Sequence, residues 1–254
     1  MAQDELQADQ TLVEHLGELR YRLLMAIYGI VPAFALCWWQ SDWIFEFVRR
    51  PIVPFLKDGG LIYTGILDKF MAYLQLSLLA SVLLTCPWWL YQVWAFVAPG
   101  LYKKEKKFAL SFLFFGSGLF LSGAAFVYTV VYPAAFGFLL QFGGEADRPM
   151  ITIDNYLSFF VSTTLVFGVC FELPLILAIL GMLGIIDQNF LRTKRRYAVV
   201  VLATVSAVIT PPDLLSMLFL LVPMMILYEI GILVVGMLQP KALEDQSSNS
   251  VTET

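Results

Sequence analysis

Long apolar runs separated by short polar segments dominate the chain. Six such runs lie at about 22–40, 70–98, 108–133, 156–183, 196–210 and 214–238. A helix needs roughly 20 apolar residues to cross the ~30 Å hydrocarbon core of a bilayer, and most of the runs reach that length. Strands of a membrane barrel would instead alternate over about ten residues. The pattern therefore predicts an all-α, polytopic membrane protein with one six-helix domain over 1–238 and a disordered tail over 239–254.

The fifth and sixth runs are joined by a very short turn. Pro211 and Pro212 lie between them, and paired prolines force the chain out of a helix. We therefore expect a tight helical hairpin. The fifth run has roughly 15 residues and covers only ~22 Å as a helix, so it is expected to thin the bilayer or to border a water-filled hollow.

The basic residues gather on one side of this pattern. Positive charge favours the cytoplasmic side of a membrane, and 11 of the 16 Lys and Arg residues fall in segments that share a side: Arg20, Arg22, Lys103, Lys104, Lys106, Lys107, Arg192, Lys194, Arg195, Arg196 and Lys241. Both termini are therefore expected in the cytoplasm. The long external loop 41–69, with "DWIFEFVRRPIVPFL", suits a helix lying in the membrane interface.

Composition narrows the class further. Hydrophobic residues make up 59% of the chain and charged residues 14%, against about 25% charged in soluble domains. The net charge of −4 comes without an extended basic face, so nucleic-acid binding is not expected. Residues 1–19 are polar and acidic, unlike a cleaved signal peptide. The three cysteines lie inside apolar runs and are expected to be buried free thiols.

No active site is apparent in the sequence. His15 is the one histidine, and it precedes the first run, so an intramembrane serine or cysteine nucleophile lacks a base. "FGSG" (115–118) is similar to the turn of intramembrane serine proteases but has Phe115 where those carry a glycine; helix packing through small residues is favoured. No nucleotide loop or metal-binding motif is present. We predict a protein that is not an enzyme, with no metal and no cofactor.

Two acids fall inside apolar runs. Glu172 is near the middle of the fourth run and Glu229 is well inside the sixth. An ionised carboxylate at the bilayer centre costs about 2.5–3.5 kcal/mol, so each acid either faces a cavity or is protonated and bonded to a neighbouring helix. Pro174 removes a backbone donor close to Glu172, which predicts a polar notch there.

Two further acids flank cytoplasmic ends of the runs. Glu18 precedes the first run, and Glu105 stands between pairs of lysines in "LYKKEKK". Each is either a solvated surface charge or a ligand for a cationic partner. Glu18 is also spaced four residues from Arg22, which favours an ion pair within one helix.

Four motifs occur in order: "HLGELRYRLL" (15–24), "QVWAFVAPGLYKKEKK" (92–107), "FGVCFELP" (167–174) and "ITPPDLLS" (209–216). With six apolar runs, the chain strongly resembles the TatC family, the core of the twin-arginine protein export machinery. The similarity extends over residues 11 to about 238.

The resemblance implies a glove-like bundle of six helices with a concave face, in the bacterial cytoplasmic (inner) membrane. It implies a receptor that binds signal peptides with consecutive arginines and recruits single-span partners, TatB and TatA. Folded cargo is then exported using the proton-motive force. A multimeric complex is expected.

The resemblance also assigns roles to residues of this chain. The family's signal-binding carboxylates map onto Glu18 and Glu105. Arginine offers a planar fork that carboxylates accept in pairs, which lysine cannot reproduce. Nearby cations are expected to repel loosely basic peptides. The set that the resemblance places around the signal peptide is completed by Arg20, Arg22, Phe96 and Lys103.

Other family positions lie deeper or outside. Glu172 matches the acid of the fourth span on the concave face, and Pro99 matches the "AFxxPGL" stretch. Pro211, Pro212 and Asp213 form the external turn, in which Asp213 is equally suited to be a helix N-cap. Several family members carry glutamine where this chain has Met217, which can only pack.

Two other classes remain open at this point. A proton-coupled secondary transporter or channel would use Glu172 and Glu229 as a relay. A structural scaffold would explain a hollow face but not the paired cytoplasmic acids.

Overall fold

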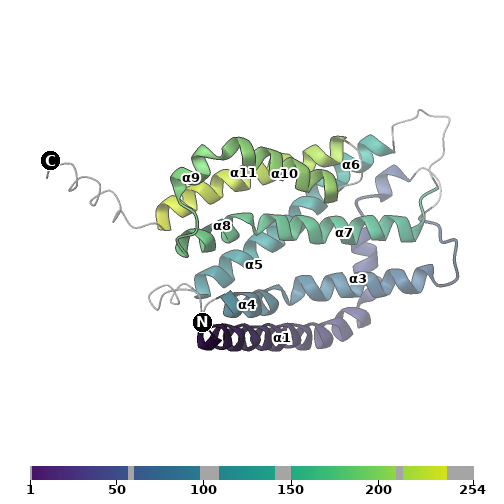
Figure 1. Ribbon diagram of the computed structural model, residues 1–254. Helices are drawn as coiled ribbons and strands as arrows, with labels where there is room; N and C mark the ends of the chain where they lie inside the picture. The colour runs from purple at the N-terminus through teal and green to yellow at the C-terminus, as the bar shows by residue number, and fades with distance from the viewer. Residues whose placement is uncertain (1, 57–59, 98–108, 141–149, 210–213, 239–254) are drawn as a thin grey trace. The chain divides into compact units, whose positions relative to one another are not determined.

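The computed structural model is built from helices that follow the apolar runs (Figure 1). It describes residues 2–56, 60–97, 109–140, 150–209 and 214–238. No strand occurs among them; one isolated parallel bridge joins Ile62 to Thr152. The prediction of an all-α fold is confirmed. Lys103, Glu105, Pro99, Pro211, Pro212, Asp213 and the tail 239–254 lie outside the described residues.

The chain divides into two compact units, Met1–Val169 and Cys170–Thr254. The first holds, in order, α1 (Ala2–Trp39), α2 (Ser41–Arg49), a 3₁₀ turn (Val53–Phe55), α3 (Asp68–Leu84), α4 (Cys86–Val97), α5 (Ala109–Phe126), a π-helix (Val127–Val131), α6 (Tyr132–Leu139) and most of α7 (Ile153–Phe171). The second holds the end of α7, α8 (Leu173–Met182), α9 (Gln188–Thr193), α10 (Arg195–Ile209) and α11 (Leu214–Leu238).

Proline explains three breaks in these helices. Pro87, Pro133 and Pro174 are each the second residue of the helix that follows a break: α4, α6 and α8. Proline is tolerated in a first turn, but it lacks an N–H and clashes with the carbonyl four residues back, so the preceding helix cannot continue unchanged. At Thr85 the result is a bend of 62° between α3 and α4.

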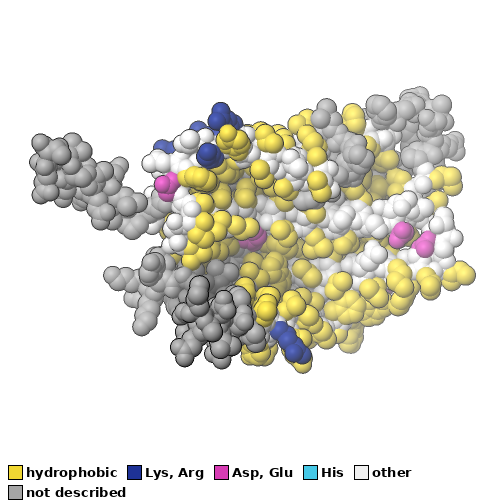
Figure 2. Space-filling view, in the orientation of Figure 1, with side chains coloured by type: hydrophobic (Ala, Val, Ile, Leu, Met, Phe, Trp, Pro, Cys, Tyr) yellow, Lys and Arg dark blue, Asp and Glu magenta, His cyan; other side chains and the backbone are white. Residues whose placement is uncertain are grey.

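Four stretches of helix are long and apolar enough to cross a membrane: Leu16–Trp39, Leu110–Leu139, Ile153–Met182 and Met217–Leu238. The bent pair α3–α4 makes a fifth if it is counted as one span. The predicted run 196–210 corresponds to α10, which has 15 residues. Leu23, Val31 and Phe114 are examples of large apolar side chains that stay exposed. Figure 2 shows hydrophobic side chains over much of the face in view, as a lipid-facing surface requires.

An aromatic cluster forms the core of the first unit. The Tyr132 ring lies 4.6 Å from Phe160 and 5.7 Å from Phe136, measured between centroids. The buried Tyr132 hydroxyl donates to the Phe160 carbonyl at 2.7 Å and shares a hydrogen bond with Thr164. Because buried polar groups are costly without a partner, these bonds allow a tyrosine at the centre of the core.

Small residues bring α8 and α11 together in the second unit. A Cβ added at Gly231 would lie 2.5 Å from the Leu177 Cδ1 atom, and one at Gly181 would lie 3.0 Å from Val235. Close approach at small residues is how helices pack in membranes, where there is no hydrophobic drive between them. The turn from α8 to α9 passes through Gly184, whose φ of 71° favours glycine.

Candidate functional site

The charged cluster at the start of the first apolar run lies on α1. Arg22 Nη2 is 3.4 Å from the Glu18 Oε1 atom, and the two side chains are 28% and 32% exposed. Arg22 Nη1 also donates to Gln92 of α4 at 3.5 Å. The cluster is therefore a chain that joins α1 to α4 and runs from the partly exposed Glu18 and Arg22 to the buried Gln92.

A close contact between the same two helices lies further along α1. The Trp88 indole N–H donates to the Met25 carbonyl at 2.8 Å. A Cβ added at Gly29 would lie 2.2 Å from the Trp88 ring, so a glycine is needed for the indole to reach α1. This contact fixes the position of α4, and thereby of Gln92, against α1.

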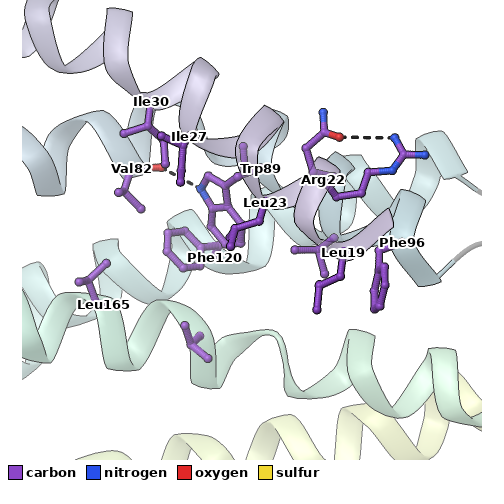
Figure 3. Close-up of a pocket in the computed structure, with 14 residues that line it drawn as sticks. Leu19, Arg22, Leu23, Ile27, Ile30, Val82, Trp89, Phe96, Phe120 and Leu165 are labelled. Carbon is purple, nitrogen blue, oxygen red and sulfur yellow. Dashed lines mark hydrogen bonds between the residues drawn. The ribbon is translucent and has the colours of Figure 1, made fainter. Parts of the chain in front are cut away.

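An apolar groove begins beside this cluster and has a volume of about 430 Å³. In Figure 3, Arg22, Leu19 and Phe96 lie at one end, and Ile30, Val82 and Leu165 lie at the other. Trp89 forms part of its wall, held by a 3.0 Å hydrogen bond to the Val82 carbonyl and an edge contact with Phe120. The remaining lining residues are Leu23, Ala26, Ile27, Gln92, Val93, Phe120 and Val169.

The groove gathers some of the residues predicted for the signal-peptide site. Arg22 and Phe96 line it, and Glu18 is adjacent through its contact with Arg22. Arg20 is exposed on α1 and has no ion pair among the described side chains. Glu105 and Lys103 lie outside the described residues, so the structure does not place them beside Glu18.

Glu172 lies at the break between α7 and α8. Glu172 is 7% exposed, and neither of its carboxylate oxygens has a hydrogen-bond partner in the part of the chain that is described. Pro174 follows two residues later, in the first turn of α8. Two buried acceptor oxygens without partners call for a proton, a water molecule or a donor from another molecule.

Glu229 has a different setting. Its Oε2 atom accepts from Arg195 Nη2 at 2.6 Å, and both side chains are about half exposed. The pair joins α11 to the start of α10. The next residue, Tyr228, donates from its hydroxyl to the Leu191 carbonyl of α9 at 2.9 Å. These two contacts join α10 and α9 to neighbouring residues of α11.

The sequence did not predict the hydrogen bonds that join residues far apart in the chain. Gln92 lies inside a quoted motif, but its bond to Arg22 joins residues 70 positions apart. Two tyrosines hold α2: Tyr128 donates to the Phe47 carbonyl at 2.9 Å, and Tyr156 donates to the Val48 carbonyl. A tyrosine inside an apolar run signals a buried hydroxyl that needs a partner, but not which carbonyl it finds.

Comparisons with known proteins agree with this architecture. The family model described as Sec-independent protein translocase protein (TatC) matches residues 14–223. Proteins of that name from Helicobacter pylori and Escherichia coli are 40% and 39% identical to this chain, covering 94% and 88% of it and 92% and 87% of their own lengths. A crystal structure described as the twin-arginine translocase receptor TatC matches with a TM-score of 0.75 and 31% identity, over 87% of this chain and 97% of that one.

The fold and these matches define a helical membrane protein of a protein translocase, which serves transport rather than catalysis. The chain belongs to the TatC family. The family expected from the four sequence motifs is thus confirmed, as is the translocase role.

Proposed function

We propose that this chain is the receptor and core subunit that binds twin-arginine signal peptides and exports folded proteins using the proton-motive force. It lies in the bacterial inner membrane with both termini in the cytoplasm and works with single-span partners of the TatA and TatB kind. The solved relative described as a twin-arginine translocase receptor supports this function, and the positions of the basic segments along the chain support the topology.

The observation that carries the proposal is a carboxylate at the charged end of an apolar groove. Glu18 is about one-third exposed, and its internal partner Arg22 lies at 3.4 Å, which is long for a charge-assisted hydrogen bond. An incoming guanidinium can therefore compete for this carboxylate. The apolar stretch that follows the arginines in a signal peptide then lies along the groove, beyond Leu19 and Phe96.

The remaining predicted residues complete this site. Glu105 supplies the second carboxylate, so that two adjacent peptide arginines are each accepted by one acid. Arg20, Arg22 and Lys103 raise the cost of binding peptides with scattered positive charge. We assign Pro99 to the same motif as Glu105, and we assign Pro211, Pro212 and Asp213 to contact with partner proteins.

The Glu229–Arg195 pair weighs against the transporter alternative. A proton relay through Glu172 and Glu229 requires the Glu229 carboxylate to be available to the next carrier, whereas its Oε2 atom is bound to Arg195 at 2.6 Å within the same group of helices. Glu172 keeps the role of an intramembrane polar notch, because its two oxygens are buried and lack partners among the described residues.

Peptide binding tests the proposal. Glu18→Ala and Glu105→Ala should each weaken binding of an Arg-Arg peptide by about ten- to a hundredfold, since a hydrogen bond to a charged group is worth about 1.5–3 kcal/mol. The double variant should lose less than the sum, because both acids serve one arginine pair. Glu105→Lys should weaken binding of the Arg-Arg peptide more than Glu105→Ala does.

Affinities are measured for Arg-Arg and Lys-Lys peptides with the purified protein. Glu46→Ala is the matched control, since Glu46 also pairs with an arginine of its own helix, Arg49, at 3.0 Å. The control should bind like the wild type. An Arg-Arg over Lys-Lys preference that is unchanged in the double variant would show that recognition lies elsewhere.

A further inference from the structure

A second apolar groove lies on the side of α2, α3 and α5 and has a volume of about 580 Å³. Its floor contains the buried residues Val48, Leu76 and Leu79. Three alanines, Ala80, Ala124 and Ala125, leave space between α3 and α5. The other lining residues are Trp43, Ile44, Phe47, Leu83, Leu84, Pro87, Leu121, Tyr128, Thr129, Phe160 and Thr164.

Aromatic residues mark the mouth of this groove. Phe47 stacks on Tyr128 at 4.6 Å between ring centroids, and Trp43 stacks on Phe47 at 5.9 Å. Trp43 is 65% exposed. Trp and Tyr are enriched where the hydrocarbon core meets the headgroups. The mouth therefore lies at the headgroup level, and the groove runs from there into the hydrocarbon.

A cation stands at this mouth. The Arg50 guanidinium lies 5.8 Å from the centre of the Phe47 ring. Arg50 is exposed, and no carboxylate pairs with it in the described part of the chain. Its neighbour Arg49 differs, because it is bound to Glu46 at 3.0 Å. Arg50 thus offers its planar fork to an anion from outside the chain.

We propose that this groove binds one phospholipid with an anionic headgroup, its phosphate on Arg50 and one acyl chain lying between α3 and α5. The size of the groove favours an acyl chain over a partner helix, since one turn of a helix 10–12 Å wide already fills roughly 400–600 Å³. Basic residues beside apolar clefts attract anionic lipids in this way. The site is separate from the groove beside Glu18.

The headgroup is tested by native mass spectrometry of the purified protein with phosphatidylglycerol and phosphatidylcholine of equal chain length. The wild type should retain phosphatidylglycerol in preference by about fivefold, the effect expected of one arginine near a headgroup. Arg50→Gln should abolish the preference, Arg50→Lys should keep part of it, and the matched control Arg49→Gln should keep all of it. Equal binding of the two lipids by the wild type, or a preference that survives in Arg50→Gln, would overturn the proposal.

The acyl chain is tested by filling the groove. Ala125→Phe places a ring in the groove and should lower retention of both lipids, whereas Ala35→Phe, at an exposed alanine of α1 that is outside the groove, should not. A photoreactive side chain at Ala125 should crosslink to lipid in membranes. Crosslinking to a protein instead would assign the groove to a partner helix and exclude the lipid.

Discussion

Gly29 sets how closely α1 and α4 approach. The Trp88 ring occupies the space that a side chain would take, and its N–H reaches the Met25 carbonyl. A carbonyl already bonded within a helix can accept a second donor because it has two lone pairs. One missing side chain thus allows a bond between two helices.

Replacing this glycine should therefore destabilise the protein. Gly29→Ala forces the Trp88 ring away, with loss of the indole bond and overpacking, at a cost of about 2 kcal/mol. Gly118→Ala in α5 is the control, because in the described part of the chain no atom beyond the neighbouring residues and backbone of its own helix lies within 4 Å of the added carbon. Thermal unfolding in detergent measures both. Equal melting temperatures for the two variants would contradict the structure of this contact.

Glu172 is the second residue whose surroundings make a prediction. Glu172→Gln keeps a hydrogen-bonding group at the break between α7 and α8, whereas Glu172→Leu removes it and strands any group that pairs with it. Export of a folded cargo should therefore survive the first change better than the second. The assay is transport into membrane vesicles at equal levels of protein, and equal export by both variants would make the polar notch irrelevant.

Residue-level contacts were predictable only where they are local. The four-residue spacing of Glu18 and Arg22 predicts their ion pair, and the structure has it. The Arg22–Gln92 bond and the Glu229–Arg195 pair depend on how helices meet. Spacing along one helix carries no information about such contacts.

At the level of elements, the apolar runs locate the helices but not their breaks. Pro174 predicts the interruption beside Glu172. The bend at Thr85 and the π-helix before Pro133 were not predicted, although Pro87 and Pro133 have the same place in the following helix. A proline in a membrane helix can be absorbed in several ways, so its sequence position does not fix the shape of the break.

The tyrosines that hold α2 give a prediction at this level. Tyr156→Phe removes the bond to the Val48 carbonyl while keeping the ring, at a cost of about 1 kcal/mol. Hydrogen exchange of the amides over Ser41–Arg49 should then become several-fold faster. Tyr91→Phe, at an exposed tyrosine of α4, should leave exchange in α2 unchanged. Unchanged exchange in Tyr156→Phe would show that the helix is held by its apolar contacts alone.

At the scale of the whole molecule, hydropathy and charge predict which end of each helix faces the cytoplasm. The packing of the helices against one another carries no such information. Single cysteines at Thr254 and Lys104 should react with an impermeant thiol reagent only from the cytoplasmic side, and one at Arg148 only from outside. The native Cys37, Cys86 and Cys170 are buried, as expected, and form no disulfide among the described residues; they are replaced beforehand. Labelling of Lys104 from outside would reverse the proposed orientation.

Composition predicted the class of the whole molecule, and four motifs predicted its family. The division into two compact units at Val169 and Cys170 was not predicted. The boundary falls near the end of α7, three residues before the break at Glu172. An apolar run of about 30 residues reads as one span whether or not its two halves pack with different neighbours, because each half is equally apolar.

The π-helix at Val127–Val131 gives this part of the chain some tolerance to a change in length. Such a turn holds one residue more than a regular helix, so losing one residue there would restore a regular helix and leave a span of almost the same length. The side chains of α6 would keep nearly the same direction relative to those of α5, because the wide turn already accommodates the extra residue. Losing one residue from the regular helix α5 would instead turn every later side chain by about 100° around the helix axis, and Tyr128 and Tyr132 would both turn away from their partners in α2 and α7.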